Sequence, residues 1–257
     1  MPSTSRISTS DRDLRNLIAP GSQAEQVGRL LLAGALVLFL PLLPFGHLLL
    51  YPFVILTTWF HEMAHGLAAM LVGWDFQRLV IFPDGSGFAE SLSPIDASPF
   101  KRAFVAAAGP LGPTLVGSLL ILASGRRRSW RPALYALAVA LILSTLIWVR
   151  SPVDVVVLPL VALILIAIAR SNRPDLERFA LQFLGILAAL SMLRDWNYLF
   201  TESAVIGGQR VLSDTGAIEA ALILPHWIWA GLITALSAIA IGASLKRALN
   251  RDGRTRR

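Results

Sequence analysis

The stretch LLLYPFVILTTWFHEMAHGLAAMLV, residues 48–72, is apolar over a length that suits a helix crossing a membrane. It contains the motif His61-Glu62-Met63-Ala64-His65. Residues i and i+4 share one face of a helix, so both imidazoles can reach a single metal ion. Burying two histidines and a glutamate in hydrocarbon is costly without a partner, and a metal ion removes that cost. The stretch therefore predicts a metal site inside a membrane helix.

The composition indicates a membrane protein. Of 257 residues, 55% are hydrophobic and only 15% are charged, whereas soluble domains carry about 25% charged residues. Cysteine is absent, so nitrogen and oxygen atoms must hold any zinc. The net charge of +7 is spread over loops and termini, which is typical of membrane orientation rather than nucleic-acid binding. We expect a multi-pass integral protein of a bacterial cell membrane, in contact with the lipid bilayer and with no nucleic-acid partner.

The apolar runs predict an all-α polytopic membrane protein with about seven transmembrane helices. Pro41, Pro44 and Gly46 can bend or break the first of them. The expected spans are 28–50, 52–72, 103–124, 131–149, 153–170, 178–195 and 223–245. Residues 28–246 are interpreted as one membrane domain, between a disordered polar tail at 1–27 and a basic tail at 247–257.

A β-hairpin-like loop is expected directly after the HExxH helix. Residues 78–82 and 88–92 are rich in strand formers, and the turn sequence Pro-Asp-Gly-Ser-Gly at 83–87 separates them. The free edge of such a hairpin can pair with an unwound segment of a substrate chain.

The third metal ligand is expected to be an aspartate. A catalytic zinc ion usually has three protein ligands and a water molecule, and counting spans puts Asp154, Asp195 and Asp214 on the side where the HExxH helix ends. Asp195 ends an apolar run and is the preferred ligand, although its neighbour Arg194 also explains it as an ordinary charged helix end. Asp214 is the reserve candidate and Asp154 comes third. Asp214 is also expected to be the N-cap of the helix that begins at Thr215, which alone would explain this aspartate.

The stretch Ala108-Gly109-Pro110-Leu111-Gly112-Pro113 opens the third span with small residues and two prolines. Small residues let helices approach closely, which is a sufficient structural reason for them in any bundle. Close to a HExxH helix, the stretch also suggests that the third span packs against that helix and forms one wall of the site.

These features together resemble the site-2 protease family of intramembrane metallopeptidases, peptidase family M50, and in particular its M50B-like branch. The resemblance rests on HEMAH (61–65) in a span, the hairpin-like loop and AGPLGP (108–113), and it extends over about residues 28–245. The segments at 193–196 and 213–215 also look like that branch.

The resemblance implies a zinc-dependent intramembrane endopeptidase that hydrolyses peptide bonds of membrane-embedded protein substrates. His61 and His65 would bind Zn²⁺ and a later carboxylate would complete the site. Glu62 would act as general base on a zinc-activated water. The third-span motif implies that Gly109, Pro110 and Thr114 bind substrate.

Two departures from the family pattern leave an alternative open. Pro113 stands where site-2 proteases usually have an asparagine, and none of the aspartate candidates is followed by glycine, as in the usual Leu-Asp-Gly motif. A catalytically inactive M50-like membrane scaffold or zinc-binding protein is therefore the alternative function. A transporter is disfavoured, because the other spans are nearly free of ionisable residues.

Overall fold

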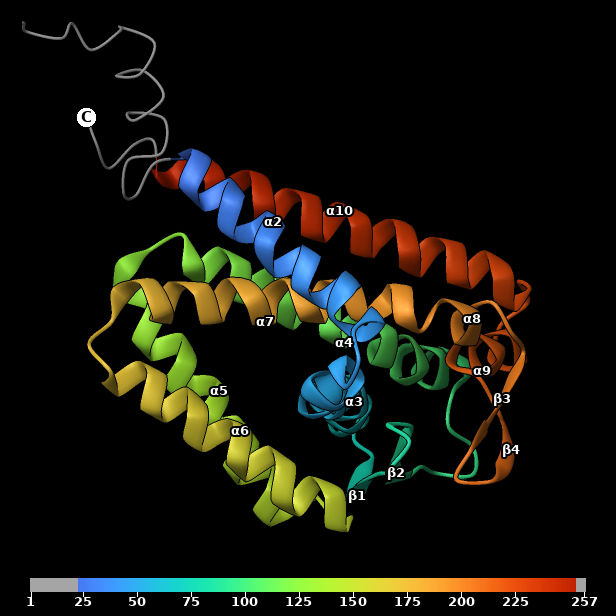
Figure 1. Cartoon of the computed structure of the whole chain (residues 1–257). Coiled ribbons are helices and arrows are strands. Elements are labelled where there is room, and N and C mark those ends of the chain that lie inside the picture. The colour runs from blue at the N-terminus through green and yellow to red at the C-terminus, as the bar shows by residue number, and fades with distance from the viewer. Residues whose placement is uncertain (1–22, 253–257) are drawn as a thin grey trace, which may run out of the picture.

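The structure is a computed structural model that describes residues 23–252 as a helical bundle with two small hairpins (Figure 1). In chain order, its elements are α2 (Gln23–Phe39), the 3₁₀ helix η1 (Leu40–Leu42), α3 (Gly46–Leu71), β1 (Asp75–Ile81), β2 (Gly87–Leu92), α4 (Pro99–Ser124), α5 (Arg127–Ile147), α6 (Pro152–Arg170), α7 (Pro174–Arg194), α8 (Trp196–Leu199), β3 (Ser203–Ile206), β4 (Gln209–Leu212), α9 (Asp214–Ala221) and α10 (His226–Asp252).

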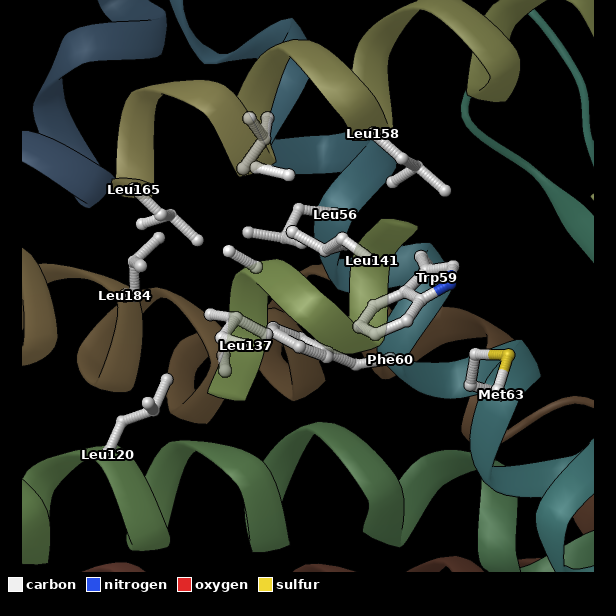
Figure 2. Close-up of a cluster of buried hydrophobic side chains, with 14 of the residues drawn as sticks. Leu56, Trp59, Phe60, Met63, Leu120, Leu137, Leu141, Leu158, Leu165 and Leu184 are labelled. Atoms are coloured by element: carbon white, nitrogen blue, oxygen red, sulfur yellow. The ribbon is translucent and has the colours of Figure 1, made fainter. Parts of the chain in front are cut away.

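Helix α3, which carries the HExxH motif, lies in the middle of the bundle (Figure 1). Its apolar side chains enter the largest buried cluster, which Figure 2 shows. Trp59 Nε1 donates a hydrogen bond of 2.9 Å to Ser144 Oγ, which satisfies the indole within this cluster. Leucines from α4, α5, α6 and α7 surround the α3 side chains: Leu120, Leu137, Leu141, Leu158, Leu165 and Leu184.

The multi-pass membrane architecture is confirmed. Five described helices are long and apolar enough to cross a membrane, namely α4, α5, α6, α7 and α10, and they correspond to the last five expected spans. The expected span 28–50 is interrupted, because α2 ends at Phe39 and residues 46–50 already belong to α3. Pro41 lies in η1, and Phe45 adopts a left-handed conformation with φ of 62° just before α3. The expected count of seven spans is therefore not confirmed within residues 23–252.

The expected tails fall partly outside the described residues. Of the polar tail at 1–27, residues 1–22 are not described and residues 23–27 begin α2. Of the basic tail at 247–257, residues 247–252 continue α10 and the last five are not described.

The hairpin after the HExxH helix is present as the antiparallel pair β1–β2. Its turn is fixed to α3, since Thr58 Oγ1 donates a hydrogen bond of 2.7 Å to the carbonyl of Gly85. The outer edge of β1 is partly occupied: the amide of Leu79 donates to Trp148 O, and the amide of Arg150 donates to Leu79 O. In the described part of the chain, the edge of β2 is the one left without a neighbouring strand.

A second hairpin, β3–β4, was not expected. Its turn is Gly207-Gly208, with φ of 57° and 79°, and two consecutive positive φ angles are the geometry that glycine permits in a two-residue hairpin turn. The sequence SAVIGGQRVL at 203–212 carries that signal between two short runs of strand formers.

Glycines bring α4 into direct contact with two neighbouring helices. A Cβ on Gly112 would lie 2.4 Å from Ala64 Cβ of α3, and a Cβ on Gly117 would lie 2.7 Å from Gly185 O of α7. Such distances leave no room for a side chain, so small residues are required at these crossings. The predicted approach of the AGPLGP stretch to the HExxH helix is therefore observed.

Substituting Gly117 by alanine is expected to lower the stability of the detergent-solubilised protein by about 1–3 kcal/mol, because the added methyl group overpacks the α4–α7 crossing. The unfolding midpoint in micelles measures this loss. Gly231→Ala is the matched control, because a Cβ on this α10 glycine would meet nothing within 4 Å. Equal midpoints for the two variants would contradict the tight crossing.

Candidate metal centre

Three side chains converge where α3 meets the start of α9. His61 Nε2 lies 2.9 Å from Asp214 Oδ2, and His65 Nε2 lies 3.1 Å from Asp214 Oδ1. The two Nε2 atoms are 3.1 Å apart. Within residues 23–252, these three residues form the group of ligand-type side chains close enough to hold one metal ion.

Asp214 is held in place by the loop that precedes it. The expected N-cap was wrong: Ser213, not Asp214, caps α9, since Ser213 Oγ accepts a hydrogen bond of 3.0 Å from the amide of Gly216. Thr215 Oγ1 donates a hydrogen bond of 2.7 Å to Leu199 O, and the amide of Ser213 donates to Glu202 O. The carboxylate therefore sits at the first helical position, where the helix dipole favours a negative charge.

His65 is oriented by helix α4. Its Nδ1 is 2.7 Å from the carbonyl oxygen of Val105, so Nδ1 carries the proton and donates, which leaves the Nε2 lone pair free for a metal. Gly109 of α4 lies against both imidazoles, and a Cβ there would come within 2.1 Å of His65 Nε2 and 2.7 Å of His61 Nε2. The first turns of α4 thus fix the ring positions from one side.

Glu62 points toward the first hairpin. It is buried, and the main-chain amide of Ala89 in β2 hydrogen-bonds to its carboxylate. Gly87 permits this approach, because a Cβ there would lie 3.2 Å from Glu62 Cγ. The acid is thus placed between the metal-type ligands and β2.

Two cavities open onto this group. One of about 300 Å³ lies beside the turn of the first hairpin and strand β3. The other, of about 680 Å³, lies between β2 and the second hairpin. The residues that line both cavities mark their junction, and they are His61, Glu62, Gly87, Tyr198 and Ile206.

The other aspartate candidates lie apart from the three-residue group. Asp195 ends α7 and forms an ion pair of 3.1 Å with Arg194 Nε. Asp154 is buried in α6, where it accepts hydrogen bonds from the Ile81 amide and from Ser151 Oγ. The geometry thus favours Asp214 over Asp195, which reverses the order expected from the sequence. Span counting could not separate them, because it assigns a side of the membrane and no position within it.

The three residues expected to bind substrate lie in different surroundings. Gly109 contacts the imidazoles, and Pro110 lines a small cavity together with His61 and Tyr198. Thr114 is buried, and its Oγ1 donates a hydrogen bond of 3.0 Å to Ser237 Oγ of α10. The hydroxyl of Thr114 is therefore engaged away from the candidate site.

Tyr198 belongs to the site but was not singled out from the sequence. It lies in the short helix α8, its ring centroid is 6.4 Å from that of His61, and its hydroxyl hydrogen-bonds to Asp214. Burial, followed by the negative charges of Asp214 and Glu62, raises the pKa of the Tyr198 phenol above its usual value. The hydroxyl therefore keeps its proton and remains a donor.

The residues present fit a metal ion. Two imidazole nitrogens and a carboxylate form a donor set typical of zinc sites. Asp214 Oδ2 is buried and accepts no well-aligned hydrogen bond, despite lying 2.9 Å from His61 Nε2. A cation would satisfy this oxygen and both nitrogens at once.

Fold and site together define a polytopic helical membrane protein with a candidate metal centre between α3 and α9. Residues 30–244 match the family described as Peptidase M50B-like. The chain belongs to this family, which confirms the resemblance expected from the sequence and indicates a membrane metallopeptidase class. Comparisons with curated proteins and with solved structures gave no match.

Substituting Asp214 by alanine is expected to reduce the metal bound per purified chain from about one ion to near zero, because two imidazoles alone form an incomplete site. Elemental analysis after dialysis measures this content. Asp195→Ala is the matched control and should retain the metal. Loss of metal in Asp195→Ala with retention in Asp214→Ala would contradict the geometry.

Proposed function

We propose that the protein is a zinc-dependent endopeptidase that cleaves membrane-embedded protein substrates. The observation that carries this proposal is the position of Glu62, a buried carboxylate beside the His61–His65–Asp214 group and at the junction of two cavities. A purely structural zinc site would have four protein ligands and no adjoining cavity. Three ligands, an acid and open space are the arrangement of a hydrolytic centre.

In the proposed hydrolysis, a bound metal ion and the side chains of the protein have different roles. A zinc ion in this site supplies Lewis acidity and lowers the pKa of water. Glu62 accepts the proton of the attacking water and returns it to the leaving amine, so that one carboxylate serves as base and then as acid. Val105 and Gly109 keep the imidazoles in position while this happens.

The free edge of β2 is the proposed place for the substrate backbone. A peptide bond inside a helix has its amide and carbonyl groups engaged, so a membrane substrate must be unwound before it is cut. An extended segment can add to β2 by main-chain hydrogen bonds. Because Ala89 of β2 already contacts Glu62, a segment on that edge passes directly beside the acid.

The cavity between β2 and the second hairpin gives this segment room. It has a volume of about 680 Å³ and reaches from Phe82 and Phe88 to His65 and Asp214. Its aromatic side chains suit apolar residues of the kind found in transmembrane segments. The lipid bilayer is then the medium from which the substrate enters.

Glu62→Gln is expected to retain zinc and to lose cleavage, because the amide preserves the shape of the carboxylate but cannot accept the proton. The protein is reconstituted in liposomes with a panel of single-span membrane peptides, and mass spectrometry detects new chain ends. Zinc per chain is measured on the same preparation.

Glu202→Gln is the matched control, because the side chain of Glu202 is exposed, and it should cleave as the wild type does. Cleavage by Glu62→Gln at the wild-type rate would overturn the mechanism. A zinc-loaded wild type that cleaves no peptide would favour the inactive scaffold, which the buried, engaged Thr114 hydroxyl also supports.

A further inference from the structure

The catalytic arrangement proposed above lacks a hydrogen-bond donor for the oxygen of the scissile carbonyl. As the scissile carbonyl is attacked, negative charge develops on its oxygen, and hydrogen-bond donors aimed at that oxygen speed the reaction. The family resemblance implies that Thr114, a residue of α4 with a donor side chain, binds the substrate. Its hydroxyl is buried and donates to Ser237 instead, so a donor must come from another element.

The residues at the junction of the two cavities limit which side chain can be this donor. A substrate segment that passes from one cavity to the other must place a peptide bond next to Glu62, at the residues that line both spaces. Gly87 and Ile206 offer no side-chain donor, while His61 belongs to the metal group. Tyr198 is therefore the junction residue that offers a side-chain donor outside the metal group, and the partner of its hydroxyl, Asp214, lies at the same site.

Arg194, a cation that lines the smaller cavity, already has hydrogen-bond partners. It lines only the smaller of the two cavities, and it donates to Thr57 Oγ1 and to Asp195 Oδ1, both at 3.1 Å. Thr58 in the same cavity donates to Gly85 O. Neither side chain can turn to the junction without breaking these bonds.

The position of Tyr198 is set by the same contacts that set Asp214. Leu199, the next residue, is buried against Met192 and Ala230, and its carbonyl accepts the hydrogen bond of Thr215 Oγ1. Tyr198 thus reaches Asp214 from α8 and lines both cavities. An oxygen atom placed next to Asp214 on the cavity side is within reach of this hydroxyl.

We propose that the hydroxyl of Tyr198 donates a hydrogen bond to the carbonyl oxygen of the scissile peptide bond as negative charge develops on it. Tyr198 is then a catalytic residue that touches the substrate, in the role for which α4 has no available donor. This inference rests on the proposed peptidase function. The hydroxyl releases Asp214 when the carbonyl oxygen enters, so the hydrogen bond is exchanged and no proton is transferred.

The test compares Tyr198→Phe with wild type on the peptide that the wild type cleaves fastest in the liposome panel. We expect kcat to fall about 100-fold or more with KM changed by less than about twofold, because the lost bond forms mainly in the transition state. The affinity for Zn²⁺, measured by competition with a chelator, should stay the same. Tyr135→Phe, at an exposed position of α5, is the matched control and should match the wild type.

Each other result overturns the proposal in a distinguishable way. Zinc affinity that falls together with kcat would make Tyr198 a positioning residue for Asp214. An unchanged kcat would show that another group contacts the carbonyl oxygen. A wild type that binds zinc and cleaves nothing would overturn the peptidase function itself, and the role of Tyr198 with it. The unfolding midpoint of each variant confirms that it is folded.

Discussion

The main free-energy cost in this architecture comes from burying two imidazoles and a carboxylic acid in an apolar helix. Without compensation, each polar group buried in this way costs several kcal/mol. The chain compensates them from three directions: Val105 O accepts from His65, β2 contacts Glu62, and Asp214 faces both Nε2 atoms. Helix α4, strand β2 and the start of α9 bring these partners to α3.

Close helix contacts make that compensation possible. Gly109 and Gly112 allow α4 to touch α3, and without them Val105 would be too far from His65. The loop before α9 works in the same way, because a Cβ on Gly216 would lie 2.1 Å from Glu202 O. Chemistry and packing therefore depend on the same small residues, and substitutions there affect both.

Sequence reasoning succeeded where a local pattern determines the outcome. The HExxH helix, the first hairpin, the last five spans and the small-residue contact between α3 and α4 all follow from runs of neighbouring residues. The relative position of Asp195 and Asp214 depends instead on how α8, β3 and β4 fold back, which no periodicity encodes. Tyr198 was missed for the same reason, since its neighbours Trp196 and Phe200 make it look like one more interfacial aromatic.

The candidate centre joins parts of the chain that are made at different times. His61 and His65 lie in the first third of the sequence, whereas Asp214 follows α8 and the second hairpin. At translation rates of about 5–20 residues per second, the gap corresponds to on the order of ten seconds. A ribosome-bound chain thus inserts its early helices before the third ligand exists. The growing polypeptide therefore cannot hold a complete metal centre until residue 214 has been made, so the site is assembled only when most of the bundle is already in place.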